Sequence, residues 1–335
     1  MKLKEALKLV PKLKGLFPAA NHIKMADGVI TWTNMSVTMS ITVDDIPKTV
    51  NGLVEPKILA HTVNSLEKFT VSEEDAFLVV RSENGEYKMP MLPPDDFPIF
   101  EEFESLSSLE LNGKALSCLY EAASFTLPDD DLALSNINLS FTKGLRITAT
   151  NRFVLYMANI PIDTDEPFEA SIPRDIVNYI PKNVVGCMAY FGSRFAVFDF
   201  GDVIMRFRLW DGKFPDASFL LDYESTFSVS LKPRVFLEQI APLRAYTSPG
   251  VNGIEFKFHD GVTISAENVD ESVNGKIVLK HLCSLPEEYT VKVNYFYLHN
   301  ALSVFDSVIN LDYVEKSNPL RFYNDDKFVV LMPIM

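Results

Sequence analysis

An asparagine that recurs at a fixed interval indicates that this chain is one unit written three times. Asn34, Asn151 and Asn268 are separated by 117 residues and again by 117, and each follows a glycine turn and a β-rich run. A second set of landmarks keeps the same interval: Phe97-Pro98, Phe214-Pro215 and Leu331-Met332. An internal repeat constrains the fold more than any other pattern, and here it predicts a row of three similar domains.

Each unit has the same predicted order of helix, strands, helix and strands. The boundaries give domains at residues 1–108, 109–224 and 225–335. Antiparallel sheets covered on one face by two helices per unit place the chain in the α+β class. An asparagine present in every unit is expected at a turn or strand end of the fold. Function is expected where the units differ.

Local patterns predict the elements within each unit. Alternating apolar residues around a turn predict three closing hairpins, which turn at Asn84-Gly85, at Gly201 and near Asp325. Helical spacing of apolar residues predicts six helices: Leu3–Lys14, Pro56–Leu66, Gly113–Phe125, Pro173–Pro181, Lys232–Tyr246 and Tyr295–Val308. Pro11 is expected to end or kink the first helix near Val10.

Composition excludes several classes of protein. The chain is 47% hydrophobic and 23% charged, has no apolar run long enough to span a membrane, and begins with a charged segment unlike a signal peptide. We therefore expect a cytoplasmic globular protein that does not act at a membrane. Cys118, Cys187 and Cys283 are odd in number and far apart, which favours reduced core thiols over disulfides or metal ligands.

The sequence carries no catalytic signature. Its five histidines show no metal-ligand spacing, and neither a nucleophile elbow nor a phosphate-binding glycine loop occurs. Clusters such as Asp44-Asp45 and Asp129-Asp130-Asp131 fall in predicted turns, where aspartate bonds to its own backbone. We therefore expect no enzyme, no cofactor and no metal. An enzyme with an aspartate-based metal site remains an alternative.

Charge is distributed unevenly along the chain. The formal net charge is −14, which by itself disfavours binding to a polyanion. The six helical windows nevertheless carry +6, which leaves −20 on the remaining residues. Helices that share one side of the molecule would form a basic surface from Lys2, Lys4, Lys8, Lys12, Lys14, Lys182, Lys232, Arg234 and Arg244. The alternative is that these residues only solubilise amphipathic helices.

Four motifs in order give the chain a resemblance to a known family. They are "LPPDDFP" at 92–98, "ITATNRFVLYMANIP" at 147–161, "DGKFPD" at 211–216 and the terminal "LMPIM". With the triple repeat, they resemble the bacterial β sliding clamp, the processivity ring of replicative DNA polymerase. The resemblance implies a head-to-tail homodimer whose six domains encircle duplex DNA, with helices lining the hole and sheets outside. Contacts from basic helices to phosphates would be independent of base sequence and would permit sliding.

The resemblance also implies a hydrophobic pocket where the replicative polymerase, the clamp loader and other partners dock a short peptide. Carried over position by position, the pocket would comprise Leu134, Thr150, Arg152, Phe153, Leu155, Pro215, Phe219, Leu220, Val330, Met332, Pro333 and Ile334. Apolar, methionine-containing walls suit peptides with Leu and Phe anchors. Without the resemblance, these residues would be taken as ordinary core positions.

The chain departs from the family at several of these positions. Arg152-Phe153-Val154 stands where the family has Gly-His-Arg, Phe219 where arginine is common, and Met335 where the family ends in Arg-Leu. The pocket should therefore be more apolar and prefer a different peptide. The acidic loop at 128–131 would repel phosphate near a DNA contact of the family. Such divergence would fit a clamp encoded by a phage or plasmid.

Assembly and function remain hypotheses at the level of the sequence. The resemblance implies a dimer contact that pairs Leu106, Leu109 and Leu111 with Ala245 and Tyr246 of a second copy. The leading hypothesis is a non-enzymatic clamp that tethers a polymerase by topology rather than by affinity. The alternative is a clamp-derived adaptor or decoy that binds replication proteins without encircling DNA.

Overall fold

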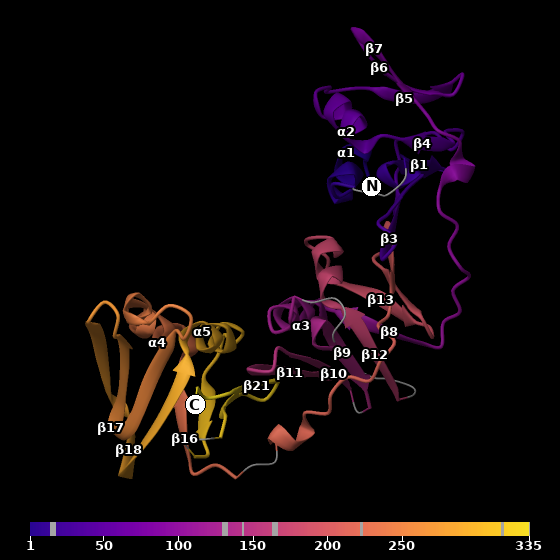
Figure 1. Cartoon of the computed structure of the whole chain (residues 1–335). Coiled ribbons are helices and arrows are strands. Elements are labelled where there is room, and N and C mark those ends of the chain that lie inside the picture. The colour runs from indigo at the N-terminus through magenta and orange to yellow at the C-terminus, as the bar shows by residue number, and fades with distance from the viewer. Residues whose placement is uncertain are drawn as a thin grey trace. The chain divides into compact units, whose positions relative to one another are not determined.

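The computed structural model divides the chain into two compact units, and each is described by itself. It describes all residues except 14–17, 129–132, 143, 163–166, 222–223, 316–317 and 335. The first unit comprises Met1–Leu116 and Asp175–Asp211, and the second comprises Ser117–Arg174 and Gly212–Met335. Each unit therefore combines segments that lie far apart in the sequence (Figure 1).

An eight-stranded antiparallel sheet forms the core of the first unit. Its strands are β1 (Ile23–Ala26), β2 (Val29–Thr33), β3 (Val37–Thr42), β4 (Gly52–Val54), β8 (Ser107–Asn112), β13 (Gly186–Phe191), β14 (Phe195–Asp199) and β15 (Val203–Arg208). They follow the order β4-β1-β2-β3-β15-β14-β13-β8. A separate three-stranded sheet comprises β5 (Thr70–Glu74), β6 (Phe77–Ser82) and β7 (Gly85–Pro90). The helical elements are α1 (Leu3–Ala6), α2 (Pro56–Asn64), η1 (Leu7–Leu9), η2 (Pro18–Asn21), η3 (Pro94–Asp96) and η5 (Arg174–Tyr179).

The second unit is built around a sheet of the same size. Its strands are β9 (Asn136–Phe141), β10 (Leu145–Thr150), β11 (Val154–Ile160), β12 (Phe168–Pro173), β16 (Phe227–Leu231), β19 (Ile309–Tyr313), β20 (Leu320–Tyr323) and β21 (Lys327–Leu331). They follow the order β12-β9-β10-β11-β21-β20-β19-β16. A separate two-stranded sheet comprises β17 (Gly253–Asn268) and β18 (Val273–Asn294). The helical elements are α3 (Gly113–Ala123), α4 (Pro233–Ile240), α5 (Tyr295–Ser303), η4 (Ala133–Ser135), η6 (Ser218–Leu221) and η7 (Ala241–Tyr246).

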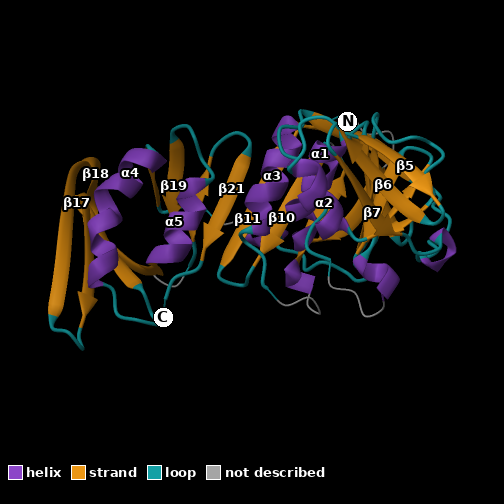
Figure 2. Cartoon of the chain, turned by 90° about the horizontal axis from the view of Figure 1, so that it is seen from above, coloured by secondary structure: helices purple, strands orange, loops and turns teal. Residues whose placement is uncertain are grey.

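Both large sheets are joined from halves that belong to different repeats. β3 of the first repeat pairs with β15 of the second, and β11 of the second repeat pairs with β21 of the third. Helices cover one face of the second sheet, where α3 and α5 lie against β11 and β21 (Figure 2). The α+β class with antiparallel sheets is therefore confirmed. Each large sheet joins strands from two repeats, so the compact units do not coincide with the repeats. The division into three domains therefore stays a prediction.

The predicted helices form, but several end earlier than the sequence pattern indicates. Helix α2 begins as expected at Pro56, where the Glu55 side chain accepts a hydrogen bond of 2.6 Å from the Ile58 backbone N–H. The first helix turns into 3₁₀ geometry and stops before extended Val10, as Pro11 requires. Its predicted extension to Lys14 is wrong for the residues described, and Lys14 itself lies outside them. The segment predicted over 173–181 is 3₁₀ rather than α-helical.

The three landmark asparagines have the structural role that their recurrence predicts. The Oδ1 of Asn34 accepts hydrogen bonds from the backbone N–H groups two and three residues later, at 3.1 and 2.7 Å. Asn151 and Asn268 accept the same pair of bonds in their own turns. A side chain that bonds its own turn in this way fixes the hairpin and leaves no site for a ligand.

The cysteines are free thiols in different environments. Cys118 and Cys187 are buried, whereas Cys283 is half-buried on β18. Burial, reinforced by the carboxylate of Asp199, raises the pKa of the Cys187 thiol to about 12. The prediction of core thiols is therefore correct for Cys118 and Cys187 but wrong for Cys283, whose strand belongs to a two-stranded sheet.

We expect iodoacetamide at mildly alkaline pH to label only Cys283 in the native protein. The reactive species is the thiolate, which burial disfavours at Cys187, and burial also keeps the reagent from Cys118. Labelling at Cys283 should also be slow, because burial raises the pKa of this thiol too. Mass spectrometry of the intact protein should therefore show one adduct before denaturation and three after it. Native labelling of Cys187 would contradict the burial described here.

Candidate functional site

A cluster of buried and partly buried apolar residues lies on the second sheet, where β11 pairs with β21. Its buried members are Leu155, Met157 and Val330, and Ala217, Leu220, Leu221 and Phe328 pack around them. β11 and β21 place these residues opposite one another, with Leu155 paired to Val330 and Met157 paired to Phe328. Neighbours along a strand face opposite sides, so Tyr156 points to the other face, where its hydroxyl donates to Glu121 of α3. The cluster therefore lies on the face away from α3.

Two rows of paired residues make up the floor of this cluster. In antiparallel strands, directly paired residues share a face of the sheet. The first row runs Asp312, Arg321, Val330, Leu155 and Thr150 across β19, β20, β21, β11 and β10. The second row runs Tyr323, Phe328 and Met157. The rings of Tyr323 and Phe328 stack with their centres 5.9 Å apart. Apolar residues at the junction are thus flanked by a charged pair on one side.

A wall is added by the segment Ala217–Leu221, most of which is η6. Leu220 and Leu221 pack onto the floor, while Phe219 projects outward and is 58% exposed. The turn is held by a hydrogen bond of 3.1 Å from the Leu220 N–H to the Ala217 carbonyl. Arg321 donates through Nη1 to the Leu221 carbonyl at 3.3 Å. Sheet and wall are therefore connected by a polar contact as well as by apolar packing.

The β10–β11 turn and the C-terminal segment contact each other beside the paired ends of β11 and β21. Phe153 is 51% exposed, and its ring stacks on Tyr297 of α5 at 5.4 Å and 15°. Its carbonyl accepts a hydrogen bond of 2.9 Å from the Met332 N–H, and Ile334 donates to the Lys292 carbonyl at 2.7 Å. The C-terminal segment is thereby tied to the same side of the unit as the turn.

The structure brings some of the predicted pocket residues together and leaves others apart. Leu155, Val330 and Leu220 meet in the cluster, and the Met332 backbone N–H donates to the Phe153 carbonyl. Thr150 uses its hydroxyl to close the turn by donating to the Val154 carbonyl. The cluster does not include Arg152, Pro215, Leu134, Pro333 or Ile334; the first two are exposed and the last three half-buried. Met335 lies outside the described residues.

Sequence reasoning missed four residues of this cluster, Met157, Ala217, Leu221 and Phe328, and also Tyr297 of α5, whose ring stacks on Phe153. Met157 could have been found, because it follows Leu155 at strand period two. Phe328 and Tyr297 could not, since their positions depend on the pairing of β11 with β21 and on the packing of α5.

Most of the predicted basic residues are exposed. Lys8, Lys12, Lys182 and Lys232 are all exposed, and Arg234 is exposed but forms an i,i+4 ion pair with Glu238 at 3.5 Å. The Arg244 guanidinium lies 5.2 Å from the centre of the Phe296 ring. Lys4 instead donates to the Leu66 carbonyl, just beyond the end of α2, so its charge stabilises that helix end. Residues 129–131 of the acidic loop lie outside the described residues.

The residues predicted for a dimer contact fall in two different settings. Leu109 and Leu111 of β8 are buried within the first unit, and Leu106 is 60% exposed. Ala245 is exposed, and Tyr246 packs so close to Gly275 of β18 that a side chain there would approach its ring to 3.0 Å. Burial thus removes Leu109 and Leu111 from the surface, whereas Tyr246 adjoins a strand of the smaller sheet.

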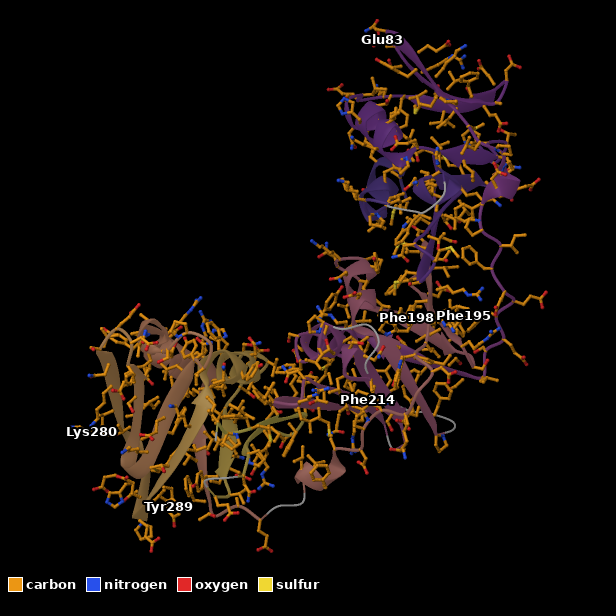
Figure 3. All side chains as sticks on the ribbon, viewed as in Figure 1. Glu83, Phe195, Phe198, Phe214, Lys280 and Tyr289 are labelled. Atoms are coloured by element: carbon orange, nitrogen blue, oxygen red, sulfur yellow. The ribbon has the colours of Figure 1, made fainter. Side chains whose placement is uncertain are left out.

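The two small sheets have free edges. β7 is an outer strand of its three-stranded sheet, and Glu83 lies at the tip of the β6–β7 hairpin (Figure 3). β18 belongs to a two-stranded sheet, on which Lys280 and Tyr289 lie (Figure 3). These edges carry backbone groups that a further strand could pair with.

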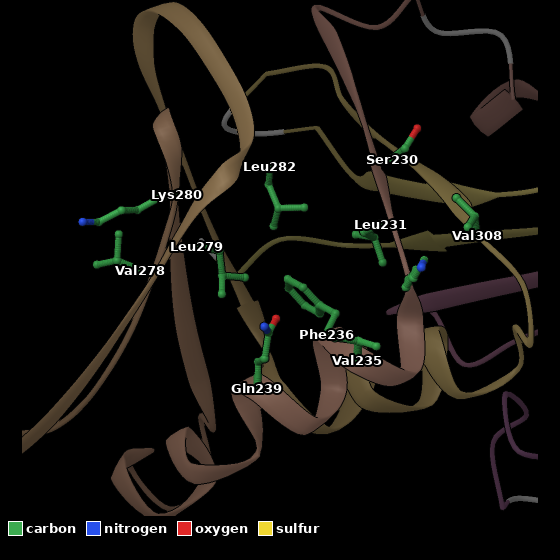
Figure 4. Close-up of a pocket in the computed structure, with 11 residues that line it drawn as sticks. Ser230, Leu231, Val235, Phe236, Gln239, Val278, Leu279, Lys280, Leu282 and Val308 are labelled. Carbon is green, nitrogen blue, oxygen red and sulfur yellow. The ribbon is translucent and has the colours of Figure 1, made fainter.

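A cavity of about 620 Å³ opens between β18 and α4, where Phe236, Leu279 and Leu231 point toward one another (Figure 4).

The described part of the chain contains neither a cluster of metal-ligating residues nor an apolar helix of membrane-spanning length. No group of three or more His, Cys, Asp or Glu residues there could hold a metal ion. None of the helices in that part is long and apolar enough to cross a membrane.

Comparison with known proteins identifies the fold. No family model matches the chain. The beta sliding clamp of Chlamydia muridarum is 19% identical over 293 residues, which cover 80% of this chain and 80% of that protein. The DNA polymerase sliding clamp of Pseudomonas aeruginosa, solved with a ligand, matches with a TM-score of 0.89 at 19% identity over 99% of this chain and 97% of that one. The chain is a divergent relative of the bacterial beta sliding clamps.

The clamp fold extends over the whole chain rather than over one repeat. The Helicobacter pylori beta clamp, solved with a DNA ligase peptide, matches with a TM-score of 0.88 at 18% identity, again over 99% of this chain and 97% of that clamp. The family resemblance inferred from the four motifs is therefore confirmed. The low identity agrees with the departures seen at Arg152-Phe153-Val154 and at Phe219.

Proposed function

We propose that this protein is a DNA sliding clamp, a non-enzymatic ring that encircles duplex DNA and tethers a polymerase and other partners. The observation that carries the proposal is the way its half-sheets combine. Two halves are joined within the chain at each of two junctions, β3 with β15 and β11 with β21. The first half of the third repeat, β17–β18, and the second half of the first repeat, β5–β7, each form a small sheet that is not joined to another half. A second copy can join both.

The repeat predicts the register of this junction between copies. Within the chain, Met39 is paired with Met205 and Tyr156 with Val329, and all four side chains are buried. Counted from the hairpin turns, Gly275 of β18 occupies the position of Met39 and Tyr156, and Tyr87 of β7 occupies the position of Met205 and Val329. Tyr87 is 42% exposed, and Gly275 is covered by the side chains of Tyr246 and Leu243, which would flank Tyr87 in this register. A large aromatic residue opposite glycine is a favourable cross-strand pair.

This register changes one of the two surfaces predicted for the dimer contact. The surface with Ala245 and Tyr246 is kept, since Tyr246 packs against Gly275. On the other copy, β7 takes the place of the segment with Leu106, Leu109 and Leu111. A head-to-tail arrangement of two copies uses the same junction twice and leaves no edge of this type open, which is the condition for a closed ring.

DNA binding in this proposal depends on charge alone. The exposed Lys8, Lys12, Lys182, Lys232 and Arg244 present cations without side chains arranged to read base edges. Attraction of this kind is independent of sequence and falls steeply with salt. The partner peptide would bind at the apolar cluster around Leu155 and Val330. The Helicobacter pylori clamp, solved with a DNA ligase peptide, supports a peptide partner in general.

Retention on circular DNA tests the ring. After loading onto a nicked circular plasmid, by a clamp loader or by reversible opening of the ring, the protein should stay bound in high salt. Cutting the plasmid once should release the protein, because at high salt the direct affinity for DNA is too weak to retain it once the topological link is lost. Equal retention on circular and linear DNA would contradict encirclement.

The alternative adaptor or decoy predicts a different result in the same assay. Such a protein would bind a peptide at the apolar cluster and show no difference between circular and linear plasmids. The departures at Phe153 and Phe219 motivate this alternative, because they alter the peptide surface without altering the half-sheet edges.

A further inference from the structure

A charged pair is buried immediately beside the apolar cluster. Arg321 and Asp312 have side chains only 6% and 8% exposed, and Nη2 of the arginine lies 3.0 Å from Oδ2 of the aspartate. Tyr323 donates its hydroxyl to Oδ1 of the same carboxylate at 3.4 Å. Burial of two charges is costly, so a pair of this kind is weak evidence for stability and is better explained by the conformation it specifies.

The pair also reaches the wall of the cluster. The second terminal nitrogen of Arg321, Nη1, donates to the Leu221 carbonyl at 3.3 Å. A guanidinium is planar and presents its N–H groups in a fixed fork, so Asp312 on one branch sets the direction of the other. Arg321 stands next to Val330 in the first row of the floor, and Leu220 and Leu221 pack on that floor.

We propose that Arg321, oriented by Asp312, is a positioning residue that holds the segment Ala217–Leu221 as the wall of the peptide site. The floor is fixed by paired strands, whereas the wall lies in the long connection between β15 and β16. A wall that is already ordered before the peptide arrives lowers the entropy lost on binding. The inference rests on the proposed function, because it concerns the affinity of the same peptide surface.

Removing both charges tests this role without leaving either one buried alone. The variant is Asp312→Leu with Arg321→Met, because apolar replacement of a buried ion pair often preserves stability. The probe is a fluorescein-labelled synthetic peptide that ends in Leu-Phe, followed by fluorescence anisotropy. We expect affinity to fall about 10-fold, which corresponds to about 1.4 kcal/mol, while the thermal midpoint stays near that of the parent. Amide exchange at Leu220, bonded to the Ala217 carbonyl, should accelerate.

Two controls separate this role from general destabilisation and from failure of the proposed function. Val262→Ala removes buried volume from β17, away from the cluster, and should lower the thermal midpoint without changing peptide affinity. Leu220→Ala removes a wall side chain and should weaken binding directly. A folded double variant that binds the peptide as the parent does would overturn the positioning role. If the parent does not bind the peptide and Leu220→Ala changes nothing, the peptide site itself is wrong.

Discussion

Replacing Tyr87 with aspartate is expected to convert the protein from particles of twice 37.8 kDa into single chains of 37.8 kDa. Tyr87 lies on the free edge of β7 and is 42% exposed. In the proposed junction its ring packs over Gly275 and against Tyr246 of the other copy. An aspartate there loses this contact and places a carboxylate against an apolar surface, which costs more than simple truncation.

The effect should be large because one substitution alters two contacts. A ring of two copies contains the junction twice, so each chain carries the altered strand into one of them. Loss of a central aromatic contact costs roughly 2–4 kcal/mol at each junction, so association should weaken by at least about 100-fold. Light scattering at micromolar concentration would detect the change in mass.

The matched control introduces the same charge at another exposed apolar position. Val185 is 89% exposed and lies outside β7, so Val185→Asp should leave the mass at twice 37.8 kDa. A Tyr87→Asp protein of unchanged mass would remove β7 from the dimer contact. If the parent protein is already a single chain, the ring itself is excluded.

Alanine at Leu220 and Met332 together is expected to reduce binding of the Leu-Phe peptide by about 100-fold. Leu220 belongs to the wall, and Met332 follows β21 directly and is tied by its backbone N–H to the Phe153 turn. Both are half-buried, so their methylene groups are available to cover an apolar anchor. Loss of about 1–1.5 kcal/mol of apolar burial at each of the two side chains gives about 2–3 kcal/mol together, which corresponds to about 100-fold. Leu155 is a poorer target, since it is 2% exposed and its truncation would leave a cavity in the sheet.

A methionine outside the cluster provides the control for this second prediction. Met188 on β13 is 39% exposed, so Met188→Ala makes the same chemical change in the first unit. Its peptide affinity should equal that of the parent. The double variant should also keep the mass of the dimer, because neither residue lies on β7 or β18. Unchanged peptide affinity in the double variant would move the docking surface elsewhere.

Much of the fold could be predicted because the repeat supplied the same evidence more than once. Asn34, Asn151 and Asn268 marked equivalent turns, and each of the three closing hairpins formed around its predicted turn. Helix ends were less predictable. The pattern of apolar residues continues past Leu9, but Pro11 cannot be part of a helix interior, and the chain leaves the helix before it.

The candidate site could be predicted only in part, for two physical reasons. The family motifs located Leu155, Leu220 and Val330, but the floor also depends on which residues face each other across β11 and β21. Register of this kind joins segments far apart in sequence. Arg321 and Asp312 were missed because a charged residue in a strand normally indicates a solvent-facing position, and only the fold reveals that this pair is buried.

The different side chains at the equivalent junctions bear on how the chain avoids folding incorrectly. Each first half presents the same kind of edge, so during synthesis β3 could accept any of three second halves. Size discriminates between them: Met39 meets Met205, Tyr156 meets Val329, and Gly275 would meet Tyr87. Tyr156 against Tyr87 would be overfilled, which is destabilising, whereas the side chains of Tyr246 and Leu243 already cover Gly275. Divergence between the repeats therefore protects the fidelity of strand pairing, which identical repeats would lose.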